Sequence, residues 1–382
     1  MLDFSGIPII DAHGHPFMPT REKEDYSYAY SMCVHGGLGD FRYLTSFQMA
    51  LQEYKRLFGL PADAPGETVI AARKAKASAD YPAFVKELYR DAGIVAVLAD
   101  FGYPITGEGL TGDELLAFAS ATADVCEDYD LIRIETTCDR LLYRPGLSFG
   151  EMLDRFGSYV ESYTKGHRVA GIKTVVGYYT GLGWRPVSYQ EARQNYESAY
   201  RGTYLPGRAD KPFRDYMVYL GLELAHRHGL VFQIHTGAGD PPACDLRLMN
   251  PNNLYELLNT EIAGKTKIVL VHAGFPYGYE AAFLAANYPN VYTDISSTVS
   301  YLGRAVESEF RKVLDVCPHN KIMFGSDGGG FVDQSWFAAN YFRKVLGEVL
   351  NEYVEKGFFT RAYAAEAGKM ILHDNAKRIY GI

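Results

Sequence analysis

The sequence predicts an α/β fold, a (β/α)8 barrel, and two observations lead to this expectation. Eight short apolar runs rich in β-branched residues recur along the 382 residues, and helical patterns stand between them. Most of these runs are continuous rather than alternating, which is typical of parallel strands covered on both faces. Strands that alternate with helices over this length favour a closed barrel. An open doubly wound sheet is the alternative, although no GxGxxG motif follows the first run.

The predicted strands and helices follow one another in a regular order. The strands are residues 7–13, 93–101, 131–137, 169–176, 230–236, 267–273, 290–296 and 321–327. Apolar residues spaced by three and four predict helices, the clearest of which are residues 112–129, 213–229, 278–290, 307–320 and 364–381. A glycine ends the second of these helices, and a proline stops the third and the fourth.

Two connections are too long to be simple loops. Residues 17–92 separate the first two strands and contain helix-like stretches at 41–60 and 81–93, and residues 177–212 separate the fourth and fifth strands. Long insertions after barrel strands lie on the face that carries the active site. We therefore expect one domain, residues 1–382, with a long helical insertion after strand one and a shorter one after strand four near the site.

Composition excludes several classes of protein. The net charge of −8 argues against a nucleic-acid partner, because phosphate binding needs a basic surface. The five cysteines are scattered without a CxxC pair, so neither a disulfide framework nor a thiolate zinc site is expected. Neither a signal-like start nor a membrane-length apolar run is present. We expect a cytoplasmic protein with a small-molecule substrate and no membrane partner, and a homo-oligomer remains open.

Ionisable residues stand at the end of every predicted strand. They are His13 and His15, Asp100, Glu135, Lys173, His235, His272, Asp294 and Asp327. In a barrel these ends converge on one opening, and residues two apart in a strand, such as the two histidines of the first, share a face. Imidazoles and a carboxylate without thiolates suit an open site for a divalent transition metal: zinc first, with manganese, iron or nickel as alternatives.

Each of these residues also has an ordinary interpretation. A single histidine is more often a hydrogen-bonded core residue than a ligand, and an aspartate before glycines, such as Asp327, commonly belongs to a turn or a helix cap. Lys173 could simply pair with Glu135. Their joint placement at the same end of successive apolar runs favours metal binding.

Together these residues resemble the metal-ligand pattern of the amidohydrolase superfamily of metal-dependent barrels. The matching positions are His13, His15, Lys173, His235, His272 and Asp327. Longer segments resemble the FluG/nodulin-like branch, among them DAHGHP, GIKTVVGYYTGL, FQIHTGAGDPPACDLRLMNP and KIMFGSDGG. The resemblance runs from the first strand to the C-terminus and is thinnest over residues 17–92 and 185–212.

The resemblance implies a hydrolase of C–N bonds, amide or amidine, in a small polar metabolite. A metal-activated water would be the nucleophile, and Asp327 would both ligate the metal and shuttle the proton. His13, His15 and His235 would complete the metal site. His272 would bind a second ion or hydrogen-bond the developing oxyanion.

Lys173 decides the number of ions that the resemblance implies. A buried lysine loses its proton more easily, and a carboxylated Lys173 could bridge two ions, with His272 among the ligands. If it stays an ammonium it would hold a substrate carboxylate beside a single ion. The family branch favours the single ion.

Substrate contacts are the least defined part of these expectations. Arg247 could clamp a carboxylate or pair with Asp240 or Asp245, and the further candidates for substrate binding are Glu135, Asp100 and Tyr178. Tyr178-Tyr179 stands where relatives often have Tyr-Arg. A decarboxylase or a uronate-isomerase-like enzyme is the alternative activity, and a non-catalytic metal- or metabolite-binding protein is the alternative of another class.

Overall fold

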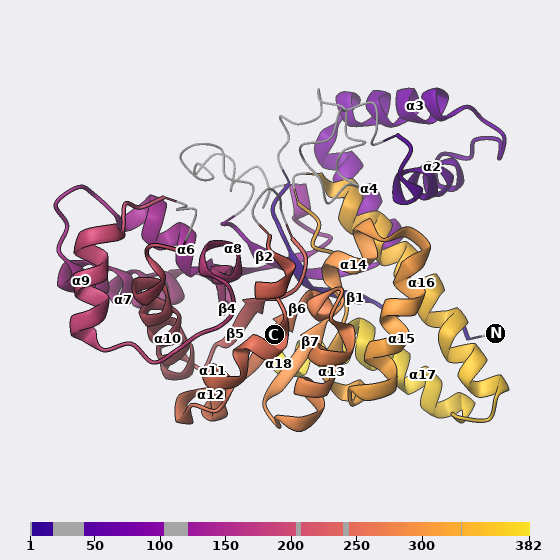
Figure 1. Cartoon of the computed structure of the whole chain (residues 1–382). Coiled ribbons are helices and arrows are strands. Elements are labelled where there is room, and N and C mark those ends of the chain that lie inside the picture. Colours follow the sequence, from indigo (N-terminus) through magenta and orange to yellow (C-terminus); the bar gives the residue numbers. More distant parts are fainter. Residues whose placement is uncertain (1, 18–41, 103–120, 204–207, 240–243, 330) are drawn as a thin grey trace.

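Eight parallel strands form the centre of the molecule, joined in chain order (Figure 1). The computed structural model describes residues 2–17, 42–102, 121–203, 208–239, 244–329 and 331–382. The strands are β1 Ile9–Gly14, β2 Ile94–Asp100, β3 Glu127–Arg133, β4 Val169–Thr174, β5 Val231–His235, β6 Ile268–Val271, β7 Val291–Asp294 and β8 Ile322–Met323. Backbone hydrogen bonds from Ala12 to Phe324 and from Asp327 to His13 close the sheet. The (β/α)8 barrel is therefore confirmed.

Helices surround the strands and build the insertions. The insertion after β1 contains α2 Thr45–Phe58, α3 Gly66–Ala79 and α4 Tyr81–Ala92. The next helices along the chain are α6 Ile134–Thr136, α7 Phe149–Gly166, α8 Val176–Thr180, α9 Tyr189–Ala199, α10 Lys211–His228, α11 Tyr255–Leu258, α12 Glu261–Lys265 and α13 Gly278–Asn287. The remaining ones are α14 Ser296–Tyr301, α15 Val306–Val316, α16 Val332–Glu355, α17 Arg361–Lys369 and α18 Asn375–Tyr380.

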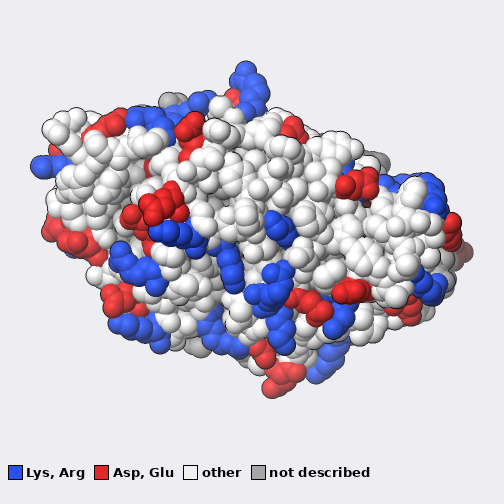
Figure 2. All heavy atoms as spheres, turned by 90° about the horizontal axis from the view of Figure 1, so that it is seen from below, with Lys and Arg blue, Asp and Glu red and all other residues white. Residues whose placement is uncertain are grey.

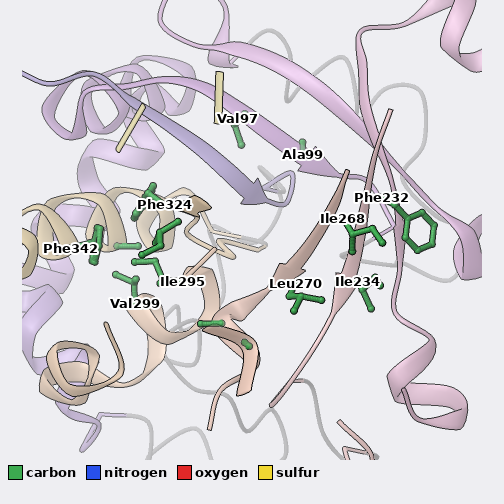
Figure 3. Packing of buried hydrophobic residues seen from close by; sticks show 14 of the residues in the cluster. Val97, Ala99, Phe232, Ile234, Ile268, Leu270, Ile295, Val299, Phe324 and Phe342 are labelled. Carbon is green, nitrogen blue, oxygen red and sulfur yellow. The ribbon is translucent and has the colours of Figure 1, made fainter. Parts of the chain in front are cut away.

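Two apolar clusters lie on opposite faces of the strands. Ile268 and Leu270 of β6 point outward to the cluster shown in Figure 3, while Val269 and Val271 fill the barrel interior. Ile379 of α18 packs against the interior cluster, as does Tyr380, whose hydroxyl accepts a hydrogen bond from Gln233. This double coverage explains why the strands read as continuous apolar runs. The docked α18 also leaves the carboxyl ends of the strands as the open end.

Some boundaries differ from those predicted. The expected helix over 112–129 lies partly outside the described residues, and its last residues, from Glu127, begin β3 instead. These residues are polar because the first half of β3 is only partly buried, which hides a strand from an apolar pattern. Glu135 consequently lies in α6 rather than at a strand end, and β8 is far shorter than predicted. Among the longer helices of the described residues, α3, α7, α9 and α16 were not predicted.

The surface charge and the apolar character of the helices bear on the expectation that the protein has neither a nucleic-acid nor a membrane partner. On the face of the molecule in Figure 2, basic and acidic side chains are interspersed rather than gathered by sign. Among the helices that the structure describes, none combines the length and the apolar character needed to cross a bilayer.

Candidate metal-dependent active site

The predicted site residues meet at the carboxyl ends of the strands. His13 lies in β1, His15 directly follows it, Lys173 is in β4, and His235 is the last residue of β5. His272 follows β6, and Asp327 lies in the loop after β8. All are buried except Asp327, whose side chain is 17% exposed toward a pocket. The convergence that the strand ends predicted is thus present.

Asp327 is the centre of the cluster. Its Oδ1 lies 3.1 Å from His13 Nε2 and 3.3 Å from His15 Nε2, and its Oδ2 lies 4.0 Å from His272 Nδ1. One ligand atom each from His13, His272 and Asp327 lie within 4.8 Å of one another. Side chains from three distant parts of the chain therefore surround one small volume.

His235 and His272 form a second contact beside this centre. His272 Nε2 lies 3.0 Å from His235 Nδ1, which also contacts the hydroxyl of Tyr178 at 3.3 Å. His272 Nδ1 meets the hydroxyl of Ser296 at 2.7 Å, and that hydroxyl lies 2.5 Å from Asp294. Hydrogen bonds of this kind hold an imidazole in one orientation.

Lys173 also contacts the cluster around Asp327, through His13. Its Nζ lies 2.7 Å from His13 Nε2 and 3.0 Å from Asp100, with the lysine side chain only 1% exposed. Glu135 accepts hydrogen bonds from Thr174 and from the Val175 amide, so the pairing of Lys173 with Glu135 considered from the sequence is wrong. The partner is the carboxylate from β2.

The surroundings favour the neutral imidazole at His13, His235 and His272 and the anionic carboxylate at Asp327. Burial lowers the pKa of His13 and His235 well below the usual range and that of His272 to about 4, and Lys173 adds to the effect on His13. Burial would raise the pKa of Asp327, but the imidazoles of His272, His13 and His15 outweigh it and hold that pKa well below its usual range. Neutral imidazole and ionised carboxylate are the protonation states in which these groups bind metals.

The residues present fit a divalent transition metal. Nε2 of His235 and Nδ1 of His13 are buried without a hydrogen-bond partner in the part of the chain that the structure describes. Buried polar atoms normally find partners, and nitrogen lone pairs beside a carboxylate oxygen are the donors that such metals prefer. The three residues whose ligand atoms all lie within 4.8 Å of one another include two predicted ligands, His13 and Asp327. The third member is His272, rather than His15 or His235.

A pocket of about 530 Å³ opens onto this cluster. Its lining residues are His15, Arg133, Lys173, Val175, Tyr178, His235, Gly239, Ser297, Tyr301, Asp327 and Gly329. Tyr178, predicted to contact substrate, lines the pocket, whereas Asp100 and Glu135 lie behind it with side chains fully buried or nearly so. Arg247 is 87% exposed and pairs with Asp245, so the ion-pair interpretation describes it; Asp240 lies outside the described residues.

Arg133 is the charged residue of the described pocket lining that the sequence analysis missed. It is the last residue of β3, so the strand-end argument would have found it with the correct strand boundary. Ser297 and Tyr301 of α14 were also missed, because a short helix after β7 has no pattern that marks it as part of a pocket.

Several known proteins are similar to this chain in sequence or in fold. The model of the amidohydrolase family, Amidohydro_2, matches residues 194–382. The protein fluG of Emericella nidulans is 27% identical over 98% of this chain, and this chain spans 45% of its length.

The C-terminal half of the chain, residues 194–382, is therefore similar to the amidohydrolase family. Solved barrels are similar in fold to the whole chain. A putative metal-dependent hydrolase from Lactobacillus casei superposes with a TM-score of 0.84 at 22% identity, over 100% of this chain and 98% of that one. A uronate isomerase from Thermotoga maritima (TM-score 0.70, 17% identity, 98% and 95% covered) and a glucuronate isomerase from Caulobacter crescentus (0.71, 15%, 99% and 92%) are also similar.

Proposed function

We propose that this chain is a member of the amidohydrolase superfamily and a metal-dependent hydrolase of a C–N bond, amide or amidine, in a small polar metabolite. The observation that carries the proposal is an ionised Asp327 that contacts the imidazoles of His13 and His15 and also lines the pocket. A carboxylate in that position faces both a ligand set and the space where a substrate would bind.

The side chains have separate tasks in this proposal. His13, His15, His235 and Asp327 would hold the ion, with zinc as the first choice. A bound divalent ion polarises a carbonyl and lowers the pKa of water toward neutrality. Asp327 accepts the proton of the attacking water and passes it to the leaving nitrogen. His272, held by Ser296, presents its imidazole toward the developing negative charge.

The contacts of Lys173 support a single ion. Lys173 lies 3.0 Å from Asp100, and this carboxylate opposes the fall in the lysine pKa that burial causes. A lysine kept as an ammonium cannot form the carbamate that would bridge two ions. We therefore propose one ion per chain.

The test is the variant Asp327→Asn, with Asp154→Asn, an exposed change on α7, as the matched control. Wild type and both variants are loaded with zinc or manganese, analysed for bound metal, and assayed on N-acyl amino acids, γ-glutamyl amides and uronates. We expect about one ion per wild-type chain and a loss of turnover of roughly 10³-fold or more in Asp327→Asn. A wild-type chain that takes up no transition metal, or full turnover in the Asp327 variant, contradicts the proposal.

A sugar-acid isomerase is the second candidate. The similarity in fold to the two isomerases covers nearly the whole chain and favours this reading, with a decarboxylase as a further alternative on the same scaffold. Nuclear magnetic resonance of the products separates the activities, because hydrolysis adds water across the bond, isomerisation conserves the formula and decarboxylation releases carbon dioxide.

A further inference from the structure

Two buried cations share one buried carboxylate on one side of the pocket. Asp100 Oδ2 lies 2.6 Å from Arg133 Nη2 and 3.0 Å from Lys173 Nζ, and the Asp100 side chain is 0% exposed. Both cations line the pocket, whereas Asp100 lies behind them. Asp327, the one carboxylate among the described lining residues, contacts the imidazoles of His13 and His15. This wall of the pocket therefore carries an excess of positive charge.

Arg133 is held rigidly in this wall. Its Nε donates to both oxygens of Asp100 at 3.1 and 2.9 Å, and its Nη1 donates to the carbonyl of Gly102 at 3.3 Å. The side chain packs so closely on Gly102 that a Cβ there would lie 2.5 Å from the arginine Cδ and 2.6 Å from its Nε. The guanidinium is thus oriented before any ligand arrives, which lowers the entropy that a ligand must lose.

The guanidinium retains binding capacity. Its contacts with Asp100 and Gly102 use one N–H of each of its three nitrogens, and a guanidinium has five N–H groups. Within the described residues, the remaining N–H groups of Nη1 and Nη2 have no acceptor. An anion in the pocket would both accept these hydrogen bonds and balance the excess charge, and a planar carboxylate matches a guanidinium best.

The position of Arg133 also limits the size of the ligand. Short contacts, each of 2.6 to 3.1 Å, link Arg133 through Asp100, Lys173 and His13 to Asp327. A small metabolite can therefore reach from the guanidinium to the cluster of imidazoles.

We propose that Arg133 binds a carboxylate of the substrate and so selects acids as the substrate class of this pocket. The choice of reaction rests on the proposed function, but recognition of the carboxylate does not require turnover. Arg133 is a specificity-determining residue in this proposal, and it takes the role that the sequence analysis considered for Arg247.

The test compares carboxylates with their carboxamides. Calorimetry measures the binding to the metal-loaded full chain of N-acetylglutamate against N-acetylglutamine, glucuronate against glucuronamide, and succinate against succinamide. Glucose 6-phosphate provides a phosphate arm. The variants are Arg133→Met, Arg133→Lys and Gly102→Ala. The added methyl group of Gly102→Ala should displace the Arg133 guanidinium while every charge is kept. The control, Arg185→Met, removes a 47% exposed arginine that pairs with Glu191.

We expect at least one acid to bind tenfold or more tightly than its amide in wild type and in Arg185→Met. Arg133→Met should abolish this preference, and Arg133→Lys and Gly102→Ala should weaken it. The proposal is overturned if no acid binds better than its amide, if the phosphate alone binds, or if the preference survives in Gly102→Ala and in whichever Arg133 variants fold. Failure of the proposed function would appear separately, as absent metal uptake or unimpaired turnover in Asp327→Asn.

Discussion

Two site residues, His272 and Asp327, have backbone conformations that non-glycine residues rarely adopt. His272 has a φ of 70° and Asp327 a φ of 54°, both in the left-handed region. Such conformations cost about 1–3 kcal/mol and persist only where surrounding contacts impose them. The Asp327 amide donates to the His13 carbonyl at 2.8 Å, and the His272 amide donates to Asp294 at 3.0 Å. Conformational strain is thus concentrated where the proposed chemistry takes place.

Ser296 is the residue whose removal tests how this geometry is maintained. Its hydroxyl connects Asp294 with His272 Nδ1, so Ser296→Ala should remove one of the contacts that orient the His272 imidazole and leave the amide of Ser297 as the remaining partner of Nδ1. We expect a fall in kcat of about 10-fold to 100-fold, the range seen when partners of site histidines are removed, with bound metal and melting temperature little changed.

Ser308→Ala, which removes an exposed hydroxyl that donates only to the Ala305 carbonyl, is the matched control. An unchanged kcat in Ser296→Ala would show that the orientation of His272 does not depend on this hydroxyl.

At the scale of elements, a buried ion pair fastens the first insertion to the barrel. Arg73 of α3 donates to Asp333, in the first turn of α16, at 2.9 and 2.5 Å, and the two side chains are 1% and 0% exposed. Because α16 directly follows the loop that carries Asp327, this pair ties the insertion to the chain beside the site.

Breaking this pair should strongly destabilise the protein. Arg73→Met removes the guanidinium that donates to the buried carboxylate of Asp333, so we expect the free energy of unfolding to fall by about 3–5 kcal/mol in urea denaturation. The double variant Arg73→Met, Asp333→Leu removes both charges and should recover much of that loss.

The exposed pair of Lys165 and Glu161 on α7 supplies the control, since Lys165→Met should change stability by less than about 1 kcal/mol. A similarly small effect of Arg73→Met would mean that the insertion does not depend on the buried pair.

At the scale of the whole molecule, the barrel separates the site from its opposite end. The docked α18 covers the interior cluster at the amino ends of the strands, and the metal-binding candidates occupy the carboxyl ends. Asp128, near the start of β3, lies at the end opposite the site, so its effect on global stability can be measured apart from the metal.

The stability of the whole protein should depend on the titration of Asp128. Burial raises the pKa of Asp128 to about 7, only partly offset by a hydrogen bond from Thr122. The unfolded carboxyl titrates near 4, so between pH 4 and 7 the folded chain binds the extra proton and the contribution of Asp128 to stability falls as pH rises.

Asp128→Asn cannot titrate, so its free energy of unfolding relative to wild type should rise by roughly 3–4 kcal/mol from pH 4 to pH 8. Denaturant titrations at pH 4, 6 and 8 measure this difference. Asp124→Asn, which changes a side chain that is 85% exposed, is the matched control. A difference that stays constant with pH in Asp128→Asn would contradict the prediction.

Much of the fold could be predicted because its signals are local. The continuous apolar runs identify strands buried on both faces, and the polar residues at their ends identify the open end of the barrel. The start of β3 was misread because a strand half-exposed to solvent, with the sequence Glu-Asp-Tyr-Asp, has no continuous apolar run. The predicted strand, 131–137, also ran past the true end of β3, and this second boundary concealed Arg133.

The amino-acid sequence by itself determined the barrel and the gathering of His13, His15, Lys173, His235, His272 and Asp327 at one end of it. Parallel strands place their carboxyl ends together whatever the details of packing. Only the tertiary structure decided that Lys173 pairs with Asp100, that Arg247 faces solvent and that Arg133 lines the pocket. The physical reason is that the partner of a charged side chain depends on distances between elements far apart in the chain.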